Sequence, residues 1–239
     1  MVFTGAGVSA ESGIPTFRDA LAGLWERFDA EELATPEAFR RDPDLVWGWY
    51  EWRRMLVMRA QPNAAHRAIA ELEGRVDRFT LVTQNVDDLH DRAGSSAPLR
   101  LHGSLFAPRC SECDEPAPLA PGIPQEPESG RRLAPPSCGR CGAKVRPGVV
   151  WFGEALPEAA IARAFEAAES CDLLLSVGTS SLVHPAAQVP WIAKRAGARV
   201  IQVNPNPTAL DEIADLNLRL PAAAALPTLL ASLSADRGG

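Results

Sequence analysis

Four of the five cysteines in this 239-residue chain fall into two C-x-x-C pairs. Cys110 and Cys113 form the first pair and Cys138 and Cys141 the second, a spacing that is typical of a tetrahedral structural zinc site. Four thiolates would fill the coordination sphere and leave no position for a catalytic water, so the metal is expected to be structural. The alternative is a pair of disulfides, which is disfavoured because the first residues do not resemble a secretory leader. Cys171 is left over and is expected to be a small buried apolar side chain.

A glycine-rich turn follows directly on the first apolar residues of the chain. Residues 1–4 favour a buried parallel strand, and Gly5, Ala6 and Gly7 then open a G-x-G-x-x-A pattern. In a dinucleotide site the first glycine permits a tight turn, and the second lets the backbone approach a pyrophosphate that faces helix-terminal N–H groups. The turn alone leaves the question open, because a short Gly-Ala-Gly often only connects a strand to a helix.

Polar side chains also stand where two later predicted strands end. Gln84, Asn85 and Asp87 follow one apolar strand, and His102 follows another. Open α/β sheets bind ligands at the carboxyl ends of their parallel strands, and an imidazole titrates near neutrality, so it can accept a proton at working pH. From the residues alone, Asn85 and Asp87 could equally cap a helix, and a lone histidine is more often structural.

The segment after the glycine turn departs from the ordinary dinucleotide pattern. Gly13 and Pro15 oppose continuation of the helix, so a long loop follows and must cover the ligand. Residues 5–18 have the sequence G-A-G-V-S-A-E-S-G-I-P-T-F-R. In this string the chain resembles the sirtuins, the NAD-dependent protein-lysine deacylases, whose signature is G-A-G-x-S-x-x-S-G-I-P-x-F-R. Further matches extend the resemblance across nearly the whole chain.

The resemblance implies a role for each polar strand end. Q-N-x-D at residues 84–87 matches a segment in which the amide of Asn85 contacts the nicotinamide ribose and the carboxylate of Asp87 holds the carboxamide. L-H-G-S at residues 101–104 matches the catalytic segment and makes His102 the general base. His66 is expected to be structural, and His90 either to serve packing or to support the site residues from behind. The other NAD contacts that the resemblance implies are Gly5, Ala6, Gly7, Phe17, Arg18, Gln84, Gly178, Thr179, Ser180, Asn204 and Ala222.

Residues 149–154 are predicted to contact an acylated-lysine protein or peptide. The run V-V-W-F at residues 149–152 is β-prone and bounded by glycines, so it could be a core strand or an edge strand that receives a peptide. The resemblance favours the edge strand, and it places Val149, Phe152 and Gly153 on the substrate. Trp151 matches no residue of the motif.

A pair on the helix expected over residues 44–59 could select the acyl group. Tyr50 and Arg53 are three residues apart and so project to the same side, where a phenol and a guanidinium could bind the carboxylate of a succinyl or malonyl group. In an arbitrary amphipathic helix Arg53 and Arg54 would simply be solvated. The resemblance to desuccinylase-type sirtuins covers the Tyr-x-x-Arg spacing and Ala34, a small residue that leaves room for a longer acyl chain, with Arg54 outside the pocket.

The order of apolar strands and helices predicts an α/β fold, specifically a Rossmann-like parallel-sheet domain with an inserted smaller domain. The sheet domain is expected over residues 1–33, 78–104 and 146–239, with a helical insert at 34–77 and a zinc-ribbon insert at 105–145. Thr35 and Asn63 are the expected N-caps of two helices. A short helical piece is also expected at residues 21–28. Further strands are predicted over residues 78–83, 172–177, 199–203 and 216–220, and further helices over 157–170, up to Ala196 and from about Ala222.

Composition restricts the partners. The net charge of -6 offers no basic surface for nucleic acid, and we find no apolar stretch long enough to span a bilayer. We expect a cytoplasmic monomer. Sirtuins generally carry a helix before the first strand, so a truncated or alternative N-terminus is expected as well.

The resemblance implies NAD-dependent removal of succinyl, malonyl and acetyl groups from lysine side chains, with nicotinamide and 2'-O-acyl-ADP-ribose as products. Plain lysine deacetylation and mono-ADP-ribosylation at the same NAD site are the near alternatives. An NAD oxidoreductase, which would return NADH, and a zinc-ribbon binding module, which would need no NAD, are the more distant ones.

Overall fold

The computed structural model describes residues 1–16, 29–122, 124 and 132–235. Within them, parallel strands form a six-stranded sheet in the order β3-β2-β1-β6-β7-β8. The strands are β1 (Val2–Thr4), β2 (Leu81–Thr83), β3 (Leu99–Arg100), β6 (Leu173–Val177), β7 (Arg199–Val203) and β8 (Leu216–Leu218).

The strand order reverses direction next to β1. The chain runs from β1 outward through β2 to β3, and then returns to the other side of β1 to form β6. Thr4 and Val177, the last residues of β1 and β6, are register partners. A crevice opens at such a reversal, outside the carboxyl ends of the strands, and this is where open α/β sheets bind their ligands.

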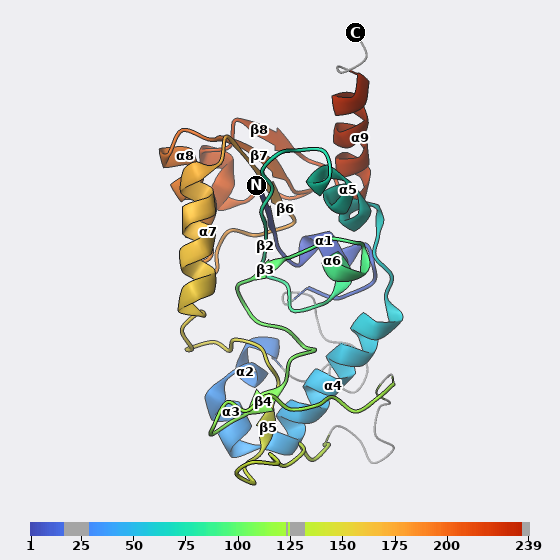
Figure 1. The fold of residues 1–239 in the computed structure, drawn as a ribbon, viewed down its shortest axis with the longest axis vertical. Helices are drawn as coiled ribbons and strands as arrows, with labels where there is room; N and C mark the ends of the chain where they lie inside the picture. Colours follow the sequence, from blue (N-terminus) through green and yellow to red (C-terminus); the bar gives the residue numbers. More distant parts are fainter. Residues whose placement is uncertain (17–28, 123, 125–131, 236–239) are drawn as a thin grey trace.

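Helices cover both faces of the sheet (Figure 1). On one face lie α5 (Ala64–Glu73) and α9 (Ala222–Ala235), which pack against each other, and α7 (Glu158–Ser170) and α8 (Gln188–Arg195) lie on the other. Consecutive strand residues alternate between the two cores: Val2 and Leu175 pack with α5 and α9, whereas Phe3 and Leu174 pack with α7 and α8. This alternation explains why the sheet strands are apolar without a polar face.

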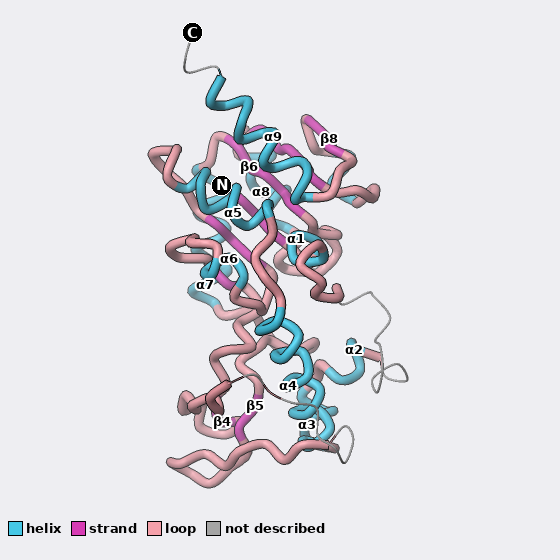
Figure 2. Tube along the Cα trace, turned by 90° about the vertical axis from the view of Figure 1, so that its right-hand side faces the viewer, coloured by secondary structure: helices cyan, strands magenta, loops and turns pink. Residues whose placement is uncertain are grey.

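A smaller part of the molecule lies at one end, away from most of the sheet (Figures 1 and 2). It contains α2 (Ala30–Leu33), α3 (Pro36–Arg41), α4 (Pro43–Arg59) and a two-stranded antiparallel ribbon of β4 (Arg109–Cys110) and β5 (Val145–Arg146). Its own core joins α4 to the segment at residues 149–151. The predicted fold class, a Rossmann-like parallel sheet with a smaller inserted domain, is confirmed.

Several local predictions hold. The hydroxyl of Thr35 accepts the N–H of Ala38 to begin α3, and the side chain of Asn63 accepts the N–H of Ala65 to begin α5. Two strands are shorter than predicted: β2 starts at Leu81, three residues later than predicted, and β8 ends at Leu218, two residues earlier than predicted. The helical piece expected at residues 21–28 lies outside the described residues. Among the described residues there are also the short helices α1 (Gly7–Ala10) and α6 (Leu89–Arg92) and a 3-10 turn (Ala209–Glu212). None of the described helices is long and apolar enough to cross a membrane.

Gly178 is expected to be intolerant of a side chain. Its φ is +61°, a left-handed conformation, and a Cβ built on it would collide with the backbone of Gly7 and Val8. Gly178→Ala should therefore lower the free energy of unfolding by at least about 2 kcal/mol, measured by urea denaturation. The control is Gly74→Ala, because Gly74 has a φ of -77° and its nearest neighbour would be 3.6 Å from the new Cβ. Equal stability of the two variants would contradict this account.

Candidate functional site

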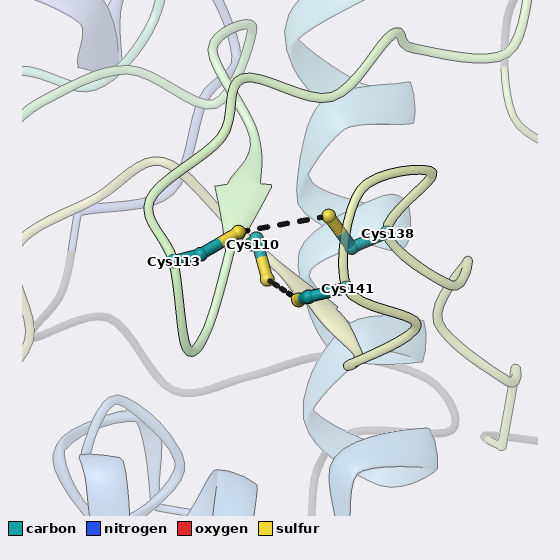
Figure 3. Close-up of side chains that lie close together, drawn as sticks. All are labelled: Cys110, Cys113, Cys138 and Cys141. Atoms are coloured by element: carbon teal, nitrogen blue, oxygen red, sulfur yellow. Dashed lines mark hydrogen bonds between the residues drawn. The ribbon is translucent and has the colours of Figure 1, made fainter.

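The four paired cysteines converge on one point (Figure 3). Their sulfur atoms all lie within 4.8 Å of one another, with 3.4 Å between Cys110 and Cys141 and 3.8 Å between Cys113 and Cys138. Thiolates bound tetrahedrally at about 2.3 Å from a zinc ion would be about 3.8 Å apart, so the cluster fits a structural zinc ion. The separations are much longer than an S–S bond of about 2.05 Å, and all four cysteines are free, which removes the disulfide alternative.

Backbone groups support the cluster in the same way at both knuckles. The N–H of Glu112 donates to the sulfur of Cys110, and the N–H of Arg140 donates to the sulfur of Cys138, each at 3.4 Å. Such donors stabilise a thiolate more than a thiol, so both knuckles are shaped for metal-binding sulfur.

A cavity of about 1020 Å³ opens at the carboxyl ends of β1 and β6 and continues toward α4. The predicted cofactor and substrate residues that the structure describes all line it. They are Gly5, Ala6, Gly7, Ala34, Tyr50, Arg53, Gln84, Asn85, Asp87, His102, Val149, Phe152, Gly153, Gly178, Thr179, Ser180, Asn204 and Ala222. Phe17 and Arg18 lie outside the described residues. A cavity of this size and polar content can hold a dinucleotide together with an extended side chain.

The glycine turn after β1 packs against the turn after β6. A Cβ on Gly5 would lie 2.8 Å from Thr179, and one on Gly7 would lie 2.7 Å from the carbonyl oxygen of Gly178. The backbone N–H of Gly7 donates to that same oxygen at 2.8 Å. These glycines are therefore needed for contact between the two turns that line the cavity, in addition to any approach of a pyrophosphate.

Thr179, which follows β6, forms hydrogen bonds to residues at the ends of two other strands. Its hydroxyl accepts the side-chain N–H of Gln84 at the end of β2, at 2.8 Å. Its carbonyl oxygen accepts the side-chain N–H of Asn204 at the end of β7, at 2.9 Å. Both predicted cofactor residues are thus held in fixed orientations at the cavity wall.

The tautomer of His102 follows from its one hydrogen bond to the backbone. Nδ1 lies 2.9 Å from the carbonyl oxygen of Gln84, and because a carbonyl can only accept, Nδ1 carries the proton. In the neutral ring Nε2 is then an acceptor, which is the state a general base needs. Burial lowers the pKa of His102 from its ordinary value, although the bond to Gln84 opposes this shift, so the ring stays neutral at physiological pH.

Ser9 is a cavity residue that the sequence analysis did not single out. Its hydroxyl donates to the carboxylate of Asp87 at 2.9 Å and accepts the side-chain N–H of Asn85 at 3.1 Å. Nδ1 of His66 accepts the backbone N–H of Asn63 at 3.3 Å, so the proton is on Nε2, which donates to the same hydroxyl at 3.3 Å. The sequence carried a signal for it, because serine is one of the specified letters in the sirtuin signature quoted above.

Asp87 serves two purposes. One carboxylate oxygen accepts the N–H of Leu89, the first residue of α6, although the N-cap position itself is Asp88 and not Asp87. The other oxygen accepts the Ser9 hydroxyl, and the side chain lines the cavity. Burial raises the pKa of Asp87, and the two hydrogen bonds oppose that rise. The bond to the start of α6 and the position in the cavity wall are thus compatible. His66 and His90 are fully buried and pack edge to face at 4.9 Å, in line with the packing expected of them.

Residues 149–152 form no strand of the protein's own sheets, so the core-strand alternative is wrong, whereas their pairing with a substrate peptide stays a prediction. Val149 makes an isolated bridge to Gly103, and the chain then turns, with the N–H of Glu154 bonded to the carbonyl of Trp151 at 3.1 Å. Glu154 stabilises this turn. Its carboxylate pairs with Arg146 at 2.6 and 2.8 Å and also accepts the backbone N–H of Trp151 at 2.9 Å.

Tyr50 and Arg53 lie together on α4, and both line the cavity. The guanidinium carbon of Arg53 is 5.8 Å from the centre of the Tyr50 ring. Burial raises the pKa of Tyr50 to about 12, so its hydroxyl is protonated at neutral pH and can donate. Arg54 is buried rather than solvated, lies outside the cavity, and pairs with Glu51 at 2.7 Å.

Comparison with known proteins identifies related sequences and structures. The model of the Sir2 family matches residues 5–185. An NAD-dependent protein deacylase of Methylococcus capsulatus is 64% identical over 236 residues, covering 99% of this chain and 92% of its own. NAD-dependent protein deacylase 1 of Pseudomonas aeruginosa is 62% identical over 232 residues, covering 96% and 92%. A crystal structure of a Sir2 homolog–NAD complex has a TM-score of 0.89 at 47% identity, covering 99% of this chain and 89% of that one, and a Sir2–p53 peptide–NAD+ structure has a TM-score of 0.84 at 30% identity, covering 98% and 92%.

Loss of one zinc ligand should unfold the ribbon. β4 and β5 pair over two residues each and have little core of their own, so the metal supplies much of their stability. Cys138→Ser should release zinc and lower both the thermal midpoint and the activity, measured by metal analysis, calorimetry and assay. Cys171→Ser is the matched control, because Cys171 is outside the cluster and should leave the zinc content unchanged. A zinc-free Cys138→Ser protein with full stability would contradict a structural site.

Proposed function

The chain belongs to the Sir2 family, and we propose that it is an NAD-dependent deacylase of protein lysine side chains that yields nicotinamide and 2'-O-acyl-ADP-ribose. The observation that carries the proposal is the single cavity in which a neutral histidine base, an amide–carboxylate pair and a tyrosine–arginine pair all face the same space. When bound, NAD supplies a ribose carbon that the acyl oxygen can attack as nicotinamide leaves.

His102 is proposed to take a proton from a ribose hydroxyl. Its Nε2 is the acceptor nitrogen, since Nδ1 is committed to the carbonyl of Gln84 at 2.9 Å. The lowered pKa keeps the ring unprotonated before reaction, and the fixed bond at Nδ1 prevents the ring from rotating away. No serine nucleophile is required for this role.

Asn85 and Asp87 are proposed to hold the nicotinamide end of the cofactor. The Ser9 hydroxyl connects them, at 3.1 Å and 2.9 Å respectively, so neither side chain can turn without breaking a buried hydrogen bond. A carboxylate fixed in this way can accept the N–H of a carboxamide, and this arrangement favours the orientation in which nicotinamide can depart.

The acyl group is proposed to be a dicarboxylic one, succinyl or malonyl, with acetyl as a further substrate. Tyr50 and Arg53 lie in a largely apolar part of the cavity, and a carboxylate at the end of the acyl chain would match both. Ala34, which is buried with its carbonyl bonded to the N–H of Phe152, leaves space beside them.

The activity can be tested with acetyl-, malonyl- and succinyl-lysine peptides incubated with and without NAD. Mass spectrometry should show loss of the acyl mass only when NAD is present, together with acyl-ADP-ribose. His102→Ala should lower the rate at least about 100-fold with unchanged zinc content and thermal midpoint. Formation of NADH would instead indicate an oxidoreductase, and ADP-ribose retained on the peptide would indicate a mono-ADP-ribosyltransferase.

Arg53→Met should change acyl selectivity. Removal of a charge-assisted hydrogen bond of about 1.5 to 3 kcal/mol should lower kcat/KM for succinyl-lysine at least about tenfold, with a change of a few-fold at most for acetyl-lysine. Arg59→Met is the control, because Arg59 is an exposed arginine of the same helix that does not line the cavity. Equal losses on both substrates would mean that Arg53 supports the helix and that the protein is a plain deacetylase.

A further inference from the structure

Trp151 is the one side chain of the 149–154 segment that matches no motif, yet it is buried and touches the acyl pocket. Its indole N–H lies 3.0 Å from the hydroxyl oxygen of Tyr50, 101 positions earlier in the chain, and both groups are buried. The two rings are tilted at 41° with centroids 6.5 Å apart. This bond therefore connects the segment beside the substrate to the helix that carries Tyr50 and Arg53.

The direction of this hydrogen bond is set by chemistry. An indole N–H can only donate, whereas a phenol has one proton and lone pairs that accept. The Tyr50 oxygen must therefore be the acceptor, and its own proton remains for a second partner. In the part of the chain that the structure describes, Trp151 is the hydrogen-bond partner of this hydroxyl and no protein acceptor competes for the proton.

Trp151 is itself held rigidly. The guanidinium of Arg146 lies 3.5 Å from the centre of its ring, and Phe39 packs against it at 5.3 Å. Arg146 is fixed in turn by two hydrogen bonds to Glu154, which also accepts the backbone N–H of Trp151. An indole fixed from its ring face and from its backbone can impose an orientation on a neighbouring hydroxyl.

We infer that Trp151 is a positioning residue that directs the Tyr50 hydroxyl proton into the cavity, toward a carboxylate at the end of the acyl chain. This rests on the proposed preference for succinyl and malonyl groups. The Tyr50 side chain lines the cavity beside Arg53, so a carboxylate held by the guanidinium is the acceptor within reach of the same pocket. Donation from the indole also polarises the phenol O–H and strengthens the bond it gives.

The kinetic test compares Trp151→Phe with the wild type on succinyl- and acetyl-lysine peptides. Phenylalanine keeps an aromatic ring in this position but removes the N–H donor together with the volume of the second ring, so a control that loses the same volume elsewhere is needed. The ratio of kcat/KM for succinyl-lysine to that for acetyl-lysine should fall about three- to tenfold. Trp47→Phe removes a buried indole from α4, the helix that carries Tyr50, at a position that does not line the cavity, and should leave the ratio unchanged.

A double-mutant cycle separates positioning from packing. If Trp151 acts through the hydroxyl, Trp151→Phe should have no further effect on the ratio in a Tyr50→Phe background, where the hydroxyl is absent. Equal losses on both acyl substrates, or a Trp151 effect that persists in the Tyr50→Phe background, would overturn the inference and leave Trp151 as a core residue.

A spectroscopic test does not depend on the substrate. Tyr50 is the only tyrosine in the chain, so the tyrosine Fermi doublet in the Raman spectrum reports its hydrogen bonding alone. The doublet ratio should show an accepting phenol in the wild type and shift in Trp151→Phe, and an unchanged ratio would overturn the bond. If the doublet shifts but the wild type removes acetyl and not succinyl groups, the proposed acyl preference fails and the role of Trp151 in selection fails with it, while NAD-dependent deacylation stands.

Discussion

The close contact between the turns after β1 and β6 is the constraint on which the rest of the site depends. The two strands are neighbours at the reversal of the sheet, so the chain must leave both in the same small space. Gly5, Gly7 and Gly178 allow this because a Cβ at any of them would meet the opposite backbone. The crevice is therefore lined by backbone and short side chains, and backbone N–H groups that can be approached closely are suited to bind phosphates. Thr179 then brings the ends of β2 and β7 to the same place through its hydroxyl and carbonyl.

A buried hydrogen-bond network joins this crevice to the helices on one face of the sheet. Ser9 is its centre: it accepts from His66 and Asn85 and donates to Asp87. The network is complete only if His66 is neutral, and burial lowers the pKa of His66 to about 4, which keeps it so. Each side chain of this network is therefore held by another buried group, whereas on an exposed loop it could rotate freely. The network thereby reduces the rearrangement of the site that is needed when a ligand binds.

The ribbon that carries the four cysteines is connected to the cavity beside Tyr50 through a chain of side-chain contacts rather than by a shared core. Arg146 ends β5 of the ribbon, pairs with Glu154 and stacks on Trp151, which donates to Tyr50 on α4. The ribbon is also attached to the start of α4, where the N–H of Leu133 donates to the carbonyl of Asp44. The cysteine cluster is thus connected to the cavity wall at Tyr50 by direct side-chain contacts.

Spacing along the chain by itself determined the features that depend on local geometry. The C-x-x-C pairs, the glycine signature, the caps at Thr35 and Asn63 and the apolar strands were all predicted from the sequence, because knuckles, turns and helix starts are formed by residues a few positions apart. The tertiary structure decided the rest. The β-prone run 149–152 forms only an isolated bridge at Val149 and leads into a turn at Phe152, which the ion pair of Glu154 with Arg146 favours. The partners of Ser9 and Trp151 lie 57 to 101 positions away. No local pattern encodes such a pairing, because it exists only once the helices and the sheet have packed.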